Sequence, residues 1–135
     1  MNYWLMKTEP GTYSWDDLVR DGRTFWDGVR NYQARNFMKE MKKGDLVLYY
    51  HSVNEKRIKG IAKVTREFYQ DPSTDDDRWV AVDIEPVEEF ENPVSLSDIK
   101  SDSRLSDMVL VKNSRLSVQP VRKEEFDIIT TKSVK

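Results

Sequence analysis

Residues 46–50 read Leu-Val-Leu-Tyr-Tyr and residues 58–64 read Ile-Lys-Gly-Ile-Ala-Lys-Val. Both runs are rich in the aliphatic, β-branched and aromatic residues that favour strands. The polar segment Asn54-Glu55-Lys56 lies between them. Two such runs joined by a short polar segment predict an antiparallel pair of strands.

Further strands are predicted on both sides of this pair. Residues 3–7 form a short apolar run, and residues 79–84 alternate as a half-buried strand does. Residues 116–121 predict a late strand that ends near Pro120. The chain therefore contains about five to six strands.

Helix signals lie irregularly between these strands. Ser14 and Asp17 form a capping box for a helix through Arg20, and residues 31–41 suit a second helix. Ser95 or Ser97 opens a third, and residues 123–129 predict a closing helix. Because strands and helices do not alternate as βαβ units, we expect an α+β fold, an open β-barrel with flanking helices and a cavity near one mouth.

The composition excludes several classes of protein. A chain of 135 residues is predicted to form one domain over residues 1–135. With no cysteine and one histidine, disulfides, thiol catalysis and Cys- or multi-His metal sites are excluded. There is no glycine-rich phosphate loop, no signal peptide and no membrane span, so we expect a cytoplasmic protein without cofactor, metal or membrane partner.

Charge is unevenly distributed along the chain. Residues 30–70 carry a net charge of +6 and residues 71–110 carry −9, although the whole chain has a net charge of −2. Such a dipolar molecule could turn one face toward phosphate while its non-specific affinity stays low. Two ordinary solvated faces would produce the same pattern.

The most unusual stretch is residues 25–36, Phe-Trp-Asp-Gly-Val-Arg-Asn-Tyr-Gln-Ala-Arg-Asn. Aromatic faces such as that of Trp26 stack on an extruded base, and amides such as those of Asn31 and Gln33 can read its edge. Arg30 and Arg35 can bind flanking phosphates as bidentate hydrogen-bond donors. Alternatively, Trp26 and Tyr32 are core residues and the arginines are solvated.

Two shorter segments add candidate site residues. His51 and Ser52 follow a strand and are expected to donate or accept hydrogen bonds at a pocket rim rather than to catalyse a reaction. Lys7-Thr8-Glu9 is the one hint of an enzyme, with Thr8 as nucleophile. Consecutive residues of a strand point to opposite faces, however, so the three side chains converge with difficulty.

Four segments together resemble the EVE domain family of the PUA-like superfamily. They are residues 4–10, 26–36, 49–52 and 115–120, in the family's order. The resemblance implies a PUA-like open barrel, related to the YTH readers of methylated adenine, that binds modified bases such as 5-methyl- or 5-hydroxymethylcytosine. Thr8 stands where the family usually has serine. The short chain resembles bacterial members, and we expect a bacterial source.

By this resemblance, the chain is a reader of modified DNA or RNA and not an enzyme. The base pocket would include Lys7, Thr8, Trp26, Asn31, Tyr32, His51, Ser52 and Gln119. The nucleic-acid backbone would contact Arg30, Arg35 and Arg115, together with Lys56, Arg57 and Lys59.

Two alternatives remain open from the sequence. Related PUA-like ASCH domains use a Lys, a Thr and a Glu, so the chain could be a small hydrolase acting on a modified nucleoside through Lys7, Thr8 and Glu9. It could also be a protein-interaction domain with a vestigial pocket. The sequence specifies neither the modification nor whether its carrier is DNA, RNA or a free nucleoside, and it predicts no oligomer.

Overall fold

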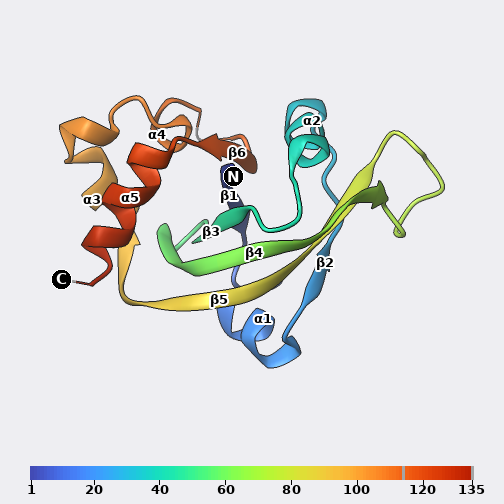
Figure 1. The fold of residues 1–135 in the computed structure, drawn as a ribbon, viewed down its shortest axis with the longest axis horizontal. Helices are drawn as coiled ribbons and strands as arrows, with labels where there is room; N and C mark the ends of the chain where they lie inside the picture. The colour runs from blue at the N-terminus through green and yellow to red at the C-terminus, as the bar shows by residue number, and fades with distance from the viewer. Residues whose placement is uncertain (114, 135) are drawn as a thin grey trace.

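The structure is a computed structural model that describes residues 1–113 and 115–134. A six-stranded mixed sheet has the strand order β2-β5-β4-β3-β1-β6 (Figure 1). Its strands are β1 Tyr3–Thr8, β2 Thr24–Trp26, β3 Leu46–His51, β4 Arg57–Gln70, β5 Val80–Ser95 and β6 Val118–Val121. The helices are α1 Trp15–Asp21, α2 Tyr32–Glu40, α3 Leu96–Lys100, α4 Val109–Lys112 and α5 Lys123–Lys132, with a 3-10 turn η1 at Ser103–Leu105. The predicted α+β class is confirmed.

The predicted pair formed by β3 and β4 is antiparallel, with Leu46 opposite Lys63 and a register shift between Tyr49 and Tyr50. β4 continues to Gln70, and beside it β5 continues to Ser95, so these two strands form the long twisted ribbon in Figure 1. Several register shifts interrupt their pairing. Bulges of this kind increase the twist and bend a sheet.

β1 pairs with β3 in parallel and with β6 in antiparallel orientation. A parallel pair needs a crossover connection, and α1, β2 and α2 supply it. The parallel register places Lys7 opposite Tyr50 and Thr8 opposite His51. Two segments that are more than forty residues apart in sequence therefore end at the same place.

The sheet buries a core on each face because strand side chains alternate. Trp4, Met6 and Tyr49 belong to one core, which α1 and α2 cover. Leu5 and Leu48 belong to the other, to which α3, α4 and α5 contribute. Figure 1 shows these last three helices gathered at one end of the molecule, away from α1 and α2.

The helix caps follow the sequence signals closely. Ser14 and Asp17 form the predicted capping box of α1, and Gly22 ends the helix in the left-handed conformation, with φ of 76°. α2 begins one residue later than predicted, because Asn31 is its N-cap and accepts a hydrogen bond from the amide of Ala34 at 2.9 Å.

Candidate functional site

A cavity of about 640 Å³ opens where β1 ends beside β2. Its lining comes from the end of β1 and the loop after it, from β2 and the segment that follows, and from the approach to β6. The lining residues are Lys7, Thr8, Glu9, Thr12, Tyr13, Thr24, Phe25, Trp26, Asp27, Gly28, Val29, Arg30 and Ser117. A volume of this size is typical of small-ligand sites.

Trp26 is the largest aromatic side chain of the lining. It lies on β2 opposite Val82 and is partly buried. Its ring meets Tyr49 edge to face, with centroids 5.6 Å apart and an interplanar angle of 83°. This contact holds the indole ring in place, while the residue also borders the cavity.

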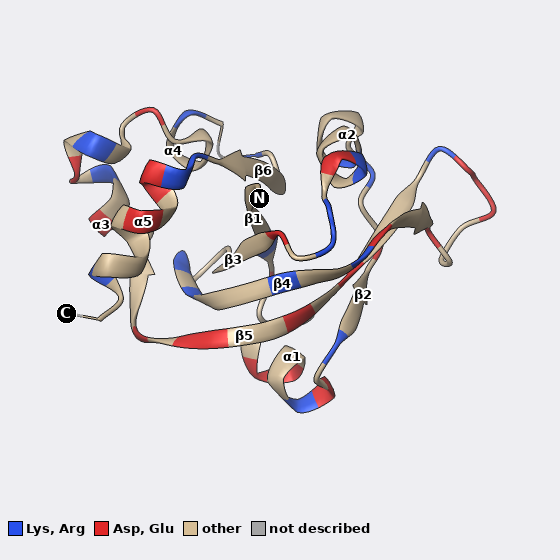
Figure 2. Cartoon of the chain, in the orientation of Figure 1, with Lys and Arg blue, Asp and Glu red and all other residues tan. Residues whose placement is uncertain are grey.

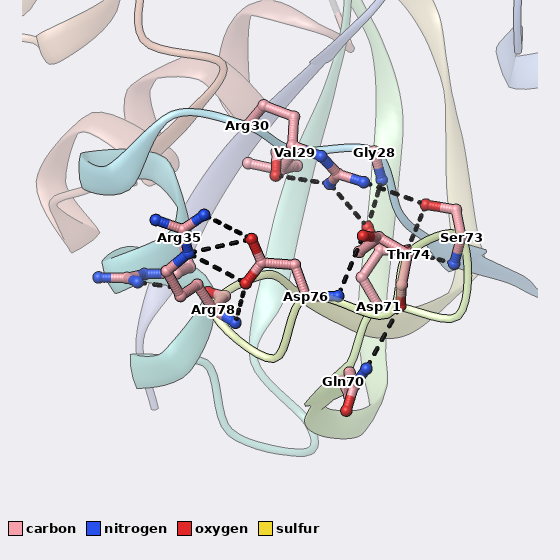
Figure 3. A network of polar contacts seen from close by, with 10 residues as sticks. All are labelled: Gly28, Val29, Arg30, Arg35, Gln70, Asp71, Ser73, Thr74, Asp76 and Arg78. Atoms are coloured by element: carbon pink, nitrogen blue, oxygen red, sulfur yellow. Dashed lines mark hydrogen bonds and ion pairs between the residues drawn. The ribbon is translucent and has the colours of Figure 1, made fainter.

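The segment from Gly28 to Arg30 is held by the buried carboxylate of Asp71 (Figure 3). Asp71 Oδ2 accepts from the amide of Gly28 at 2.8 Å and from Arg30 Nη1 at 3.0 Å. Its Oδ1 accepts from the amide and hydroxyl of Ser73. Gly28 has φ of 76°, a conformation that favours glycine.

Burial alone would raise the pKa of the Asp71 carboxyl. Hydrogen bonds from Ser73, from the Gly28 amide and from Arg30 outweigh that effect and lower the pKa to about 2. Asp71 is therefore ionised at neutral pH and holds this wall of the cavity in one conformation.

Thr8 contributes a hydroxyl group to the cavity lining. Its Oγ1 donates to the carbonyl oxygen of Tyr13 at 2.7 Å, and the hydroxyl of Tyr49 donates to the same oxygen at 3.3 Å. Burial raises the pKa of the Tyr49 hydroxyl. The Thr8 proton thus points to a main-chain carbonyl rather than to a side-chain base, an arrangement that favours binding over nucleophilic attack.

Lys7 also lines the cavity, and partial burial lowers the pKa of its ammonium group. Its Nζ lies 5.7 Å from the centroid of the Tyr50 ring, within the range of a cation–π interaction. Three of the predicted pocket residues border this cavity, namely Lys7, Thr8 and Trp26.

His51 and Ser52 do not belong to the cavity lining. His51 Nε2 accepts from the Trp15 amide at 2.9 Å, and its Nδ1 lies 3.2 Å from Glu55 Oε1. The hydroxyl of Ser52 donates to the carbonyl of Thr8 at 3.0 Å. His51 thus joins the end of β3 to the start of α1, and Ser52 joins the segment after β3 to the end of β1.

Asn31, Tyr32 and Gln119 also differ from the expected placement. Asn31 is occupied as the cap of α2, while Tyr32 is 52% exposed and stacks on Trp79, with centroids 5.0 Å apart. Gln119 is fully buried, and its Nε2 donates to the carbonyl of Leu116 at 2.8 Å. The turn into α2 points Tyr32 toward the start of β5, so the predicted pairing of Trp26 with Tyr32 around one cavity is not found.

Of the candidate backbone contacts, Arg30 borders the cavity and forms an ion pair with Asp71 at 3.0 Å. The guanidinium group of Arg35 covers the Tyr32 ring at 5.0 Å. The other candidates do not line the cavity. Lys56 and Arg57 are exposed at the β3–β4 hairpin, Lys59 Nζ is 3.9 Å from Glu55, and Arg115 is exposed two residues before Ser117.

The basic and acidic segments of the chain lie side by side. Figure 2 shows acidic residues along β5 next to basic residues on β4. Lys63 on β4 forms an ion pair with Glu85 on β5 at 3.0 Å. The charge blocks of the sequence are thus partly neutralised by local pairing.

Several residues of the site carry no signal in the sequence that points to it. Thr12, Tyr13, Thr24 and Ser117 line the cavity, and Asp71 holds its wall. Ser117 lies inside a segment that the sequence had singled out. Asp71 is 43 residues from Gly28, and no local pattern connects the two.

Within the described residues, no group of three or more His, Asp or Glu side chains could hold a metal ion. Over the same residues, no helix is both long enough and apolar enough to cross a bilayer.

Comparison with known proteins gives the family and a related complex. The family described as EVE domain matches residues 2–132. Human thymocyte nuclear protein 1 is 36% identical over 162 aligned positions, which cover 95% of this chain and 72% of that protein.

Two solved structures are similar along nearly the whole chain. A protein from Agrobacterium tumefaciens superposes with a TM-score of 0.97 at 42% identity, covering 98% of this chain and 93% of its own. The human THYN1 protein in complex with DNA containing 5-methylcytosine superposes with a TM-score of 0.92 at 36% identity, covering 100% and 99%.

Proposed function

This chain belongs to the EVE domain family, and on that premise we propose that it reads nucleic acid by taking a modified base into the cavity beside Trp26. The observation that carries the proposal is an aromatic-walled cavity in a fold that superposes over its full length on a relative bound to DNA containing 5-methylcytosine. Methylated and hydroxymethylated cytosines are the bases we assign to it.

The proposed roles follow from where each side chain lies. Trp26 stacks on the modified base. Lys7 and Thr8 contact it from the cavity lining, and Ser117 is added to these base-contacting residues. His51, Ser52 and Gln119 act indirectly, by positioning the strands. Ser52 bonds to Thr8, His51 bonds to the start of α1, and Gln119 lies opposite Leu5 of β1. Asn31 acts as the cap that orients α2, and Tyr32 acts through its stacking on Trp79.

The nucleic-acid backbone is assigned to the surrounding cations. These are Arg30, Arg35, Arg115, Lys56, Arg57 and Lys59. Arg30 borders the cavity itself, and the β3–β4 hairpin that carries Lys56 and Arg57 is joined to β1 by the hydrogen bond from the Ser52 amide to the Thr8 carbonyl at 2.8 Å. Each such contact with phosphate makes binding fall as salt rises.

We assign the whole chain, residues 1–135, to a single domain of a bacterial protein that works in the cytoplasm on DNA or RNA. The absence of cysteine agrees with a reducing compartment but does not require it. The similarity to a bacterial protein at 42% identity supports a bacterial source.

A binding module is favoured over a hydrolase at this site. In the hydrolase, Lys7 or Glu9 would activate the Thr8 hydroxyl, but that hydroxyl donates to the Tyr13 carbonyl at 2.7 Å. No catalytic role is therefore assigned to these three residues.

The test is a binding panel of matched oligonucleotides. DNA and RNA strands that differ only in carrying cytosine, 5-methylcytosine or 5-hydroxymethylcytosine are titrated against the protein. We expect a modified base to bind more tightly by about 1–3 kcal/mol, the free energy of one added group in a fitted pocket. Equal affinity for every member of the panel would contradict the proposal, and release of a product from modified nucleosides would favour the hydrolase.

A further inference from the structure

Four planar side chains form a continuous stacked row that begins at the cavity. The guanidinium carbon of Arg30 lies 5.5 Å from the Trp79 ring centroid, and Trp79 lies 5.0 Å from Tyr32 at an interplanar angle of 31°. The guanidinium carbon of Arg35 then lies 5.0 Å from the Tyr32 ring centroid. Because Arg30 also lines the cavity, the row leads away from its mouth.

Two members of the row pack against Tyr32. The Trp79 ring centroid and the Arg35 guanidinium carbon each lie 5.0 Å from the Tyr32 ring centroid, and Tyr32 is still 52% exposed. Arg78 donates to the Tyr32 hydroxyl at 3.1 Å and is 59% exposed at its side chain. The row therefore presents exposed guanidinium groups to solvent beside the Tyr32 ring.

The cations of the row differ in how their charge is balanced. Arg30 is paired with Asp71, and Arg78 is paired with Asp76 at 2.6 Å (Figure 3). Arg35 donates instead to the side chain of Asn36 and to the carbonyl of Arg78. In the part of the chain that the structure describes, no carboxylate forms an ion pair with Arg35, so its positive charge stays uncompensated.

We propose that this row, Arg30, Trp79, Tyr32 and Arg35, together with Arg78, binds the phosphates on one side of the base that enters the cavity. Stacking and hydrogen bonds hold each guanidinium group in place, so little side-chain entropy is lost when a phosphate is bound. The part of the cavity near Glu9 and Tyr13 is less favourable for phosphate. The carboxylate of Glu9 lines it, and the Tyr13 hydroxyl already donates to the carboxylate of Asp21. This inference rests on the proposed function and adds a direction to it: the strand is held mainly on one side of the modified base.

The first test places the modified base at the 5′ end, the centre or the 3′ end of a short single strand. With the modified base at one end, the strand keeps the phosphates that reach the row, so it binds like the strand with the base at the centre. With the modified base at the other end, the strand lacks those phosphates and binds more weakly. The slope of log K against log salt concentration is then smaller by about 0.7 for each lost contact. Equal binding at both ends would overturn the proposal.

The second test uses variants of the row. Arg35→Ala is expected to weaken binding to modified and unmodified strands by the same factor, to reduce the salt slope by about 0.7 and to make the two terminal placements more alike. Asp76→Asn is expected to act in the opposite direction, because it removes the carboxylate that neutralises Arg78. Arg104→Ala is the matched control, since Arg104 is 64% exposed at its side chain and paired with Asp102 away from this surface.

The outcomes separate the two proposals. A change in the modified-to-unmodified ratio in Arg35→Ala would place Arg35 in the base site and overturn the one-sided contact. Unchanged affinity in both Arg35→Ala and Asp76→Asn would overturn it too. If the unaltered protein prefers no modified base in any placement, it is the proposed function that fails.

Discussion

Trp26 is the residue on which stacking of the base depends. In Trp26→Ala we expect affinity for the modified strand to fall by about 1–3 kcal/mol, because a base that has left its neighbours loses the surface that replaces them. Trp26 is partly buried against Tyr49, so stability also falls, though by less than the about 3–5 kcal/mol of a fully buried tryptophan. The melting temperature and the modified-to-unmodified affinity ratio are measured on the same protein.

Phe68→Ala is the control for this variant, because Phe68 is an aromatic residue 46% exposed on β4 and absent from the cavity lining. It should leave the affinity ratio unchanged. A folded Trp26→Ala protein that keeps the wild-type ratio would show that the base is held elsewhere. If Trp26→Ala lost its folded structure and its binding together, Trp26 would be a core residue.

Asp71 is expected to make the folding stability depend on pH in the acid range. Its pKa is lowered to about 2 in the folded protein, below the about 3.9 of an unfolded chain. The stability that this ionised carboxylate contributes is therefore complete above about pH 4 and is lost as the pH falls toward 2. Asp71→Asn should be less stable than the wild type at neutral pH, and the difference should shrink across that window.

Urea unfolding at a series of pH values between neutrality and 2 measures this difference. Asp75→Asn is the matched control, because Asp75 is exposed in the same loop. If Asp71→Asn and the wild type differ by the same free energy at every pH, the carboxylate of Asp71 does not hold the cavity wall through its charge.

At the scale of elements, β4 passes α1 so closely that Gly60 leaves no room for a side chain. A Cβ there would lie 2.5 Å from the carbonyl oxygen of Glu88 and 2.8 Å from the Trp15 ring. The oxygen belongs to the backbone of β5, so relief requires one strand to move. We expect Gly60→Ala to destabilise the protein by about 1–3 kcal/mol, as overpacking does.

Gly11→Ala is the comparison, because a Cβ at Gly11 has nothing within 4 Å. Chemical denaturation of the two variants gives the difference in unfolding free energy. Equal stability of Gly60→Ala and Gly11→Ala would mean that α1 and β5 can separate without cost. In that case the position of Trp15, and of the His51 that binds its amide, would not be fixed by packing.

For the molecule as a whole, binding should need no metal. Among the described residues no acidic or histidine cluster could hold an ion, and the sequence contains no cysteine. Treatment with a chelator, followed by the panel of oligonucleotides, should leave both affinity and melting temperature unchanged. Loss of binding that zinc restores would contradict this expectation.

Local patterns in the sequence were sufficient for the elements whose causes are local. Ser14 with Asp17 predicted α1, and the apolar runs at 46–50 and 58–64 predicted the β3–β4 pair. The three-residue β2 was missed, because a strand that short has too few residues to show a period. The likeness to the EVE family was also readable, because it rests on the order of residue types.

What only the tertiary structure decided is which of these residues share one site. Parallel pairing of β1 with β3 places His51 opposite Thr8 and lets Ser52 donate to the Thr8 carbonyl. The turn into α2 points Tyr32 at Trp79 rather than at Trp26. Asp71 reaches Gly28 across 43 residues. The sequence by itself determined the α+β class and the candidate residues, since propensity, capping and composition act over a few neighbours. The cavity and the stacked row depend on contacts between distant segments, whose geometry no short-range pattern encodes.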